Sequence, residues 1–171
     1  SYFNYATGDA DEGEAHGFSI ERAYLTYEND VSEKVSFKFQ TDVINPENGA
    51  GWELYLKNAK LDYVCKENMV LTLGLQGMNM FKVQEKTWGN RFVAKSAMDA
   101  NGWSSSADLG FSISDTFILT TANKSIELFT VNLMITNGEG YKTTSDIDNN
   151  SKISLQLLHG EKRLDKNDGY N

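Results

Sequence analysis

The side chains best suited to catalysis or metal binding are two histidines and two acid-rich stretches. His16 and His159 are the only histidines and lie far apart in the sequence, so no local pattern pairs a histidine base with an orienting carboxylate. The stretches GDADEGEAHG and SDIDNNS carry acids at alternate positions, as calcium loops do. However, Ile20 and Leu157 stand where such a loop needs its bidentate glutamate. We interpret these acids as solvated loop residues.

Other signatures of enzymes and cofactor sites are missing from the sequence. It contains no GxSxG nucleophile turn, no glycine-rich phosphate loop after a strand and no HExxH zinc motif. Cys65 is the single cysteine, so neither a disulfide framework nor a cysteine-based zinc site is predicted. We therefore expect a protein that is not an enzyme and that binds no metal and no cofactor.

One segment is basic within a chain whose formal charge is −8. Residues 80–95, MFKVQEKTWGNRFVAK, contain Lys82, Lys86, Arg91 and Lys95 against one acid, Glu85. If this segment folds into the lumen of a barrel as a constriction loop, its cations would favour anions. The alternative is an ordinary solvated loop with a short helix, because the two lysines at 82 and 86 lie four residues apart.

The elements that position these groups are predicted to be long strands. In KVSFKFQTDV, residues 34–43, apolar and polar side chains alternate, which is the period of a strand. No run approaches the roughly 18 to 20 apolar residues of a membrane helix, while most candidate strands have the roughly 9 to 11 residues that cross a bilayer at a tilt. The candidates lie near residues 1–6, 17–28, 34–43, 53–64, 69–79, 104–113, 126–136 and 151–159.

The connections between these strands alternate in length. ENDVSEK and VCKENM are short, whereas INPENGAG, residues 78–103 and NGEGYKTTSDIDNN are long and rich in glycine, asparagine and aspartate. Short turns on one side and long loops on the other are typical of outer-membrane barrels. Residues 114–125 break this alternation, and a short extra strand there is one explanation.

An internal repeat supports an up-and-down meander. A shift of 36 residues places the apolar pattern of residues 20–27 on that of residues 56–63. In both copies the pattern changes parity at the equivalent point, since Leu54 and Leu56 lie on the opposite parity to Ala59, Leu61 and Tyr63. A β-bulge, or a strand that rises above the membrane near its loop, would produce such a change.

The two sides of the strands would differ in polarity. The apolar rows, which include Val35, Phe37, Phe39, Leu71, Leu73 and Leu75, are expected to face lipid. On a soluble sheet the polar row would be a plain solvent face, but in a barrel it would line the pore. The candidate pore-lining residues are Arg22, Lys38, Gln40, Asp42, Lys60, Asp62, Gln76, Asp108 and Asn132.

The succession of FSIERAYLTYEND, LTLGLQG before a long loop, SSSADLGFSIS and NLMITNGEG resembles the amino-terminal half of bacterial outer-membrane porins of the phosphate-selective porin O and P type. This resemblance implies a 16- to 18-stranded barrel, usually a homotrimer, with the third extracellular loop folded inward. The basic residues of segment 80–95 would then lie in or beside the constriction. The family's proline after the glycine of the fifth strand is missing, since GMNMFKV stands there, and the polar row is not rich in arginine or lysine. Phosphate selectivity is therefore not carried over.

The sequence thus predicts an all-β, antiparallel up-and-down transmembrane β-barrel, with residues 1–171 forming a partial chain of a porin and residues 78–103 an inward-folding loop. The expected function is passive diffusion of small hydrophilic solutes or ions through the outer membrane of a Gram-negative-type envelope. Outer-membrane lipid is the expected partner, and the acidic balance argues against nucleic acid. Two alternatives remain open: a complete eight-stranded barrel acting as an anchor or adhesion scaffold, and a soluble all-β ligand-binding module.

Overall fold

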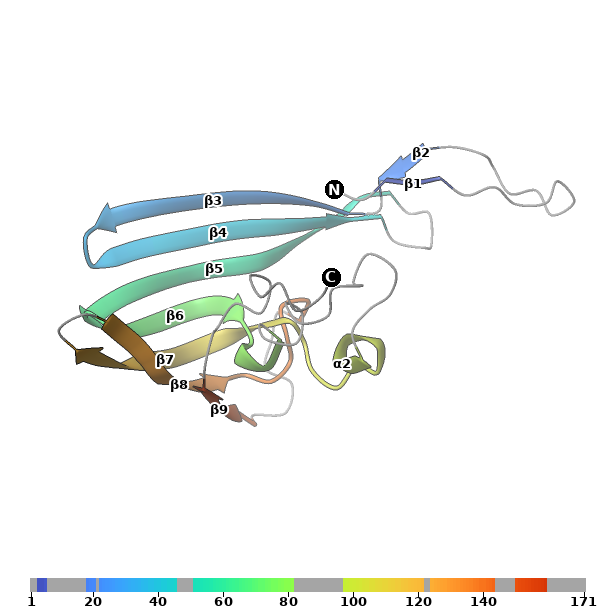
Figure 1. Cartoon of the computed structure of the whole chain (residues 1–171). Coiled ribbons are helices and arrows are strands. Elements are labelled where there is room, and N and C mark those ends of the chain that lie inside the picture. Colours follow the sequence, from blue (N-terminus) through green and yellow to red (C-terminus); the bar gives the residue numbers. More distant parts are fainter. Residues whose placement is uncertain are drawn as a thin grey trace, which may run out of the picture.

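The computed structural model describes residues 3–5, 18–20, 22–45, 51–81, 97–121, 124–143 and 150–159. Seven of its strands form one antiparallel sheet in chain order, so each strand is hydrogen-bonded to the next one along the chain (Figure 1). These strands are β3 (Arg22–Ser32), β4 (Val35–Ile44), β5 (Glu53–Lys66), β6 (Met69–Gly77), β7 (Ala107–Thr121), β8 (Lys124–Thr136) and β9 (Lys152–His159). The predicted all-β antiparallel meander is confirmed.

The remaining described elements are short. Strands β1 (Phe3–Tyr5) and β2 (Phe18–Ile20) pair with each other in a separate two-stranded sheet, and α2 (Ala97–Ala100) is a single helical turn. The predicted strand at 17–28 is therefore wrong as one element, because β2 and β3 belong to different sheets. Among the described residues, no helix is long and apolar enough to cross a membrane.

The seven-stranded sheet is open. Strands β3 and β9 form its two edges, and no pairing between them is found in the described part of the chain. An eight-stranded barrel closed by these elements is therefore not observed.

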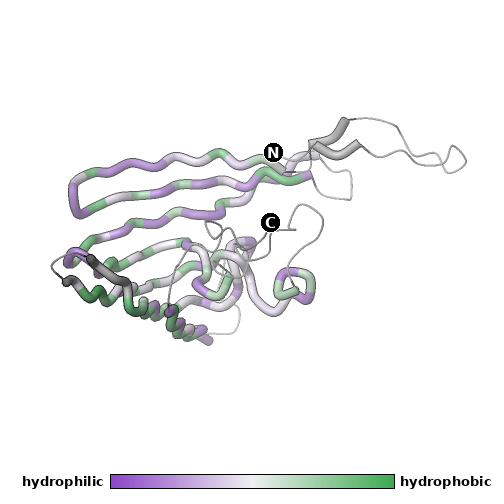
Figure 2. The backbone as a smooth tube through the Cα atoms, viewed as in Figure 1, coloured by the Kyte–Doolittle hydropathy of each residue, from purple (hydrophilic) through white to green (hydrophobic). Residues whose placement is uncertain are grey.

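Each strand has one apolar and one polar side, and the register aligns these sides across the sheet. On one side Phe37 is opposite Leu61, and Leu61 is opposite Leu73. On the other side Asp62 is opposite Thr72. We call the apolar side the outer face and the polar side the inner face. Figure 2 shows the resulting alternation of hydrophobic and hydrophilic residues along the strands.

A β-bulge in β5 keeps the outer face apolar. Gln40 is opposite Asn58, but the next residue of β4, Thr41, is opposite Leu56, so Lys57 is the extra residue. The bulge returns Leu54 and Leu56 to the same face as Leu61. The change of parity predicted from the sequence at this point is confirmed.

Strands β7 and β8 are longer than their patterns predict. Their pairing continues to Thr121 and Lys124, with a bulge after Phe117, so the hypothesis of an extra strand within residues 114–125 is wrong. Within the described residues the neighbouring strands end earlier, because Met69 of β6 is opposite Asp115 and His159 of β9 is opposite Phe129. The two strands therefore extend past both neighbours as a hairpin.

The sheet is curved from β3 to β9 (Figure 1), and two glycines lie opposite each other on its inner face. These are Gly74 of β6 and Gly110 of β7. A Cβ atom at Gly74 would lie 2.2 Å from the carbonyl oxygen of Ala59, and one at Gly110 would lie 2.2 Å from that of Ile135. Only glycine allows such close approach, and paired glycines on one face are a known means of curving a sheet.

Candidate functional site on the inner face of the sheet

The polarity of the sheet is the reverse of that of a water-soluble domain. On the outer face, Leu73 is 63% exposed, Ile153 70% and Leu155 64%. Among the described side chains, by contrast, the buried ones are mostly polar: Thr41, Asp42, Asn58, Thr72, Gln76, Asn79, Asp108, Ser112, Thr130 and Thr136 are buried, against four apolar residues, Met78, Phe81, Ala107 and Met134. In a soluble protein large apolar side chains provide the core, so exposed apolar surface of this extent marks a contact with a partner, either another protein or a membrane.

All eight candidate pore-lining residues whose side chains are described lie on the inner face. Arg22 is the first residue of β3, and its side chain is not among those that the structure describes. The four cations of segment 80–95, Lys82, Lys86, Arg91 and Lys95, lie outside the described residues. The pairings place Lys38, Gln40, Asp42, Lys60, Asp62, Gln76, Asp108 and Asn132 on one side of the sheet.

One part of the inner face carries charges that balance locally. Lys38 and Lys60 are directly opposite each other, an arrangement that is unfavourable for two like charges. Each has its own carboxylate: the Lys38 Nζ lies 2.6 Å from the Glu28 Oε1, and Lys60 pairs with Asp62. Thr72 Oγ1 also donates to Asp62 Oδ1 at 2.5 Å. A small hollow of about 190 Å³ lies beside these four charged residues.

Gln40 belongs to a chain of neutral hydrogen bonds across three strands. Its Nε2 donates to Thr26 Oγ1 of β3 at 2.8 Å, and its Oε1 accepts from Asn58 Nδ2 of β5 at 2.7 Å. Such amide and hydroxyl groups exchange readily with water and with polar solutes. This part of the wall is polar without a strong charge.

Gln76 and Asp108 form hydrogen bonds to backbone groups, so these two side chains stabilise the fold. Gln76 Nε2 donates to the Gly110 carbonyl at 3.2 Å, and Ser112 Oγ donates to Gln76 Oε1 at 2.7 Å. The Asp108 carboxylate accepts backbone N–H groups from Leu109, Gly138 and Gly140 at 2.8, 2.6 and 3.2 Å. Both side chains are about 3% exposed, so a solute would not touch them in this arrangement.

The segment expected to fold inward begins with residues 78–81. These residues lie against the inner face of β8 and β9. Asn79 is the central residue of this contact: its Nδ2 donates to Asn132 Oδ1 at 3.2 Å, and its Oδ1 accepts from Ser154 Oγ at 2.6 Å. Met78, Phe81 and Met134 form a small apolar cluster beside it. The connection after β6 therefore crosses β7 on the inner side of the sheet.

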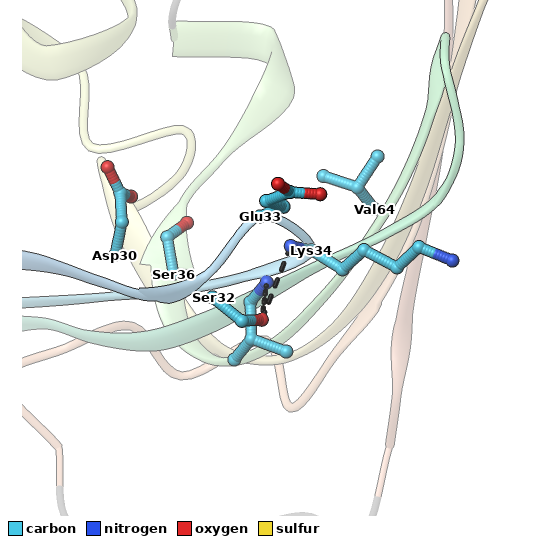
Figure 3. Close-up of a pocket in the computed structure, with 7 residues that line it drawn as sticks. Asp30, Ser32, Glu33, Lys34, Ser36 and Val64 are labelled. Carbon is cyan, nitrogen blue, oxygen red and sulfur yellow. Dashed lines mark hydrogen bonds between the residues drawn. The ribbon is translucent and has the colours of Figure 1, made fainter.

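A second hollow, of about 410 Å³, lies at the turn between β3 and β4 (Figure 3). Ser32 Oγ accepts the backbone N–H groups of Lys34 and Val35 there, at 3.3 and 3.1 Å. The charged side chains of Asp30, Glu33 and Lys34 do not converge on one point. Among the described residues, no group of three histidine, cysteine or acidic side chains is arranged to hold a metal ion.

The chain matches no protein-family model, no curated protein and no solved structure. The polarity, length and curvature of the sheet are the features from which its role can be inferred.

Proposed function

We propose that this chain forms part of the wall of an outer-membrane β-barrel, a porin through which small hydrophilic solutes or ions diffuse passively. The observation that carries the proposal is the reversed polarity of the sheet. Apolar side chains cover the outer face of all seven strands, whereas polar side chains are gathered on the inner face. Lipid outside and water inside satisfy both faces.

The strand lengths support a membrane location. Crossing the hydrocarbon layer at a tilt takes roughly 9 to 11 residues, which is well above the usual strand length of about 5 or 6. The strands from β3 to β8 contain between 9 and 15 residues. β9, an edge strand, contains 8 residues. A soluble meander has no need of such uniformly long strands.

The inner face supports diffusion and gives no support to tight binding. Carboxylates, ammonium groups, amides and hydroxyls alternate along it, and the lysines at 38 and 60 each have an acidic partner. A wall of this kind keeps a lumen wet without holding one solute strongly. Since the seven strands leave the sheet open, the proposal requires further strands to close the barrel, as the resemblance to 16- to 18-stranded trimeric porins implies.

A soluble ligand-binding module would need another layer of protein over the outer face. The contiguous row Leu73, Phe111 and Ile135, whose members are directly opposite one another on β6, β7 and β8, is 39% to 63% exposed. An apolar patch of that extent on a free soluble domain would cause association. The membrane proposal explains the same row without a second protein.

The test is to purify the full-length protein and measure its partition and its conductance. We expect it in the detergent extract of outer membranes, and we expect stepwise, roughly ohmic current increases when it is added to a planar bilayer in KCl. A protein that stays monomeric in water without detergent contradicts the membrane location. A membrane-bound protein that produces no current and no solute flux contradicts the porin assignment alone.

A further inference from the structure

The bulge in β5 aims Lys57 into a cluster of aromatic and acidic side chains on the inner face. Its Nζ lies 3.8 Å from the Asp42 Oδ2 and donates to the Tyr24 hydroxyl at 3.2 Å. The same ammonium group lies 5.1 Å from the ring centroid of Tyr24 and 5.2 Å from that of Tyr141. Cation–π contacts of this kind are favourable, and more so when the ammonium group is shielded from water. Bulges frequently re-aim a side chain in this way at functional positions.

Tyr141 does not belong to these strands. It lies in the connection between β8 and β9, whose residues 137–143 we call the strap. The strap is fixed at its base by Asp108, which accepts the N–H groups of Gly138 and Gly140. Both glycines have positive φ angles, 100° and 86°, a backbone conformation that turns the strap back over the sheet.

The far end of the strap reaches across the inner face. Tyr141 N donates to the Ala107 carbonyl of β7 at 3.0 Å, whereas its hydroxyl donates to Asp42 Oδ2 of β4 at 3.1 Å. Strands β5 and β6 lie between these two partners, a separation of about 14 Å on a flat sheet. The Tyr141 ring also contacts that of Tyr55 on β5 edge to face, with centroids 6.4 Å apart. The strap therefore covers part of the inner face.

The attachment to β4 is strong because the acceptor is a buried carboxylate. Asp42 is 0% exposed, and removing a partner from a buried charge is costly. The Lys57 ammonium lies near both this carboxylate and the Tyr141 ring, so it adds an attraction to each of them. Lys142 adds a second contact, with its Nζ 4.8 Å from the Tyr55 ring centroid.

We propose that the strap is a second constriction of the channel, separate from the basic segment 80–95, and that Tyr141 held by Asp42 and Lys57 limits the size of the solutes that pass. This inference rests on the proposed function, since a constriction matters only if solutes cross the inner face. The solutes concerned are neutral or charged polar molecules, and the strap discriminates among them by cross-section.

The experiment uses the full-length protein in two assays with three variants. Tyr141→Phe keeps the ring and removes the hydroxyl, Tyr141→Ala removes the obstruction, and Tyr63→Phe on the outer face is the matched control. Hydrogen exchange measured by mass spectrometry in detergent reports how firmly residues 137–143 are held. Swelling of protein-containing liposomes in a series of sugars from mono- to trisaccharide reports the size limit.

We expect the strap amides to exchange about tenfold faster in Tyr141→Phe, the factor for losing one hydrogen bond to a charged group, and unchanged in Tyr63→Phe. In Tyr141→Ala the trisaccharide rate should rise several-fold relative to the monosaccharide rate. Unchanged exchange in Tyr141→Phe overturns the attachment. Faster exchange with an unchanged sugar profile in Tyr141→Ala overturns the constriction. If wild-type liposomes swell in no sugar, the porin proposal fails and the constriction with it, while exchange still decides whether Tyr141 holds the strap.

Discussion

At the scale of single residues, the face on which a side chain lies decides which substitutions the protein tolerates. Leu73, in the middle of the outer face, is 63% exposed, whereas Ser114 lies on the inner face of the neighbouring strand. Replacing Leu73 by Arg should cost about 2 to 4 kcal/mol if the residue lies near the middle of the bilayer. Ser114→Arg should cost far less. Urea titration of protein folded into liposomes measures both, and equal tolerance at the two positions would refute the membrane orientation.

A second prediction at this scale concerns the carboxylate at the base of the strap. Asp108→Asn keeps the shape of the side chain but leaves one oxygen to accept three backbone N–H groups. We expect a loss of about 1 to 3 kcal/mol, because buried donors lose a charged acceptor. The exchange of amides 138 and 140 should accelerate with it. Asp30→Asn, at an exposed position, is the control, and a similar loss there would show that the effect is not specific to the strap.

The sequence shows which residues share a face but not which residues of distant strands meet. Alternation placed eight of the candidate lining residues on the inner face because the period of a strand is a local property. Lys57 and Tyr141 were not singled out from the sequence. The hydroxyl of Tyr141 donates a hydrogen bond to Asp42, a residue 99 positions away, and no local sequence pattern predicts such a contact.

At the scale of elements, a close contact between strands depends on glycine. Gly110 makes the cleaner test, since its φ lies outside the left-handed region, unlike that of its partner Gly74, which is 116°. A methyl group in Gly110→Ala would lie 2.2 Å from the Ile135 carbonyl oxygen, so β7 and β8 would have to separate. We expect a loss of about 1 to 3 kcal/mol, typical of overpacking. Ser114→Ala, on the same strand and face, should change the urea midpoint little, and an equally small change at Gly110 would contradict the close approach.

The elements that the sequence predicts best are those with unbroken alternation. Strand β4 was expected at 34–43 and is found at Val35–Ile44. The hairpin at the far ends of β7 and β8 was missed because the segment TFILTT is apolar at three successive positions, and the bulge after Phe117 changes the parity again. Alternation alone could not distinguish a strand extension there from a separate element.

At the scale of the whole molecule, the polarity of the sheet favours the proposed membrane location. The balance of charges on the inner face bears on the ion selectivity of the proposed channel. Three inner-face lysines, at 38, 57 and 60, each lie within 4.0 Å of a carboxylate. Paired charges largely cancel a few ångströms away, so this wall should contribute little ion selectivity. Within this part of the channel, a strong anion preference would then arise from the basic segment 80–95 and not from the described wall.

The reversal potential in a KCl gradient should report the contribution of the basic segment most clearly at low ionic strength, where screening is weakest. A variant with Lys82, Lys86, Arg91 and Lys95 all replaced by glutamine should lose most of the anion preference and shift toward the potential of a nonselective pore. Its matched control, Glu28→Gln combined with Lys38→Gln, removes one paired charge of each sign and should leave the potential unchanged. If the control shifts the potential as much as the four-residue variant does, the selectivity arises from the wall and the basic segment is not the constriction loop. If the four-residue variant alone shifts it, the cations of segment 80–95 act on ions in the lumen, as a loop folded into the channel would.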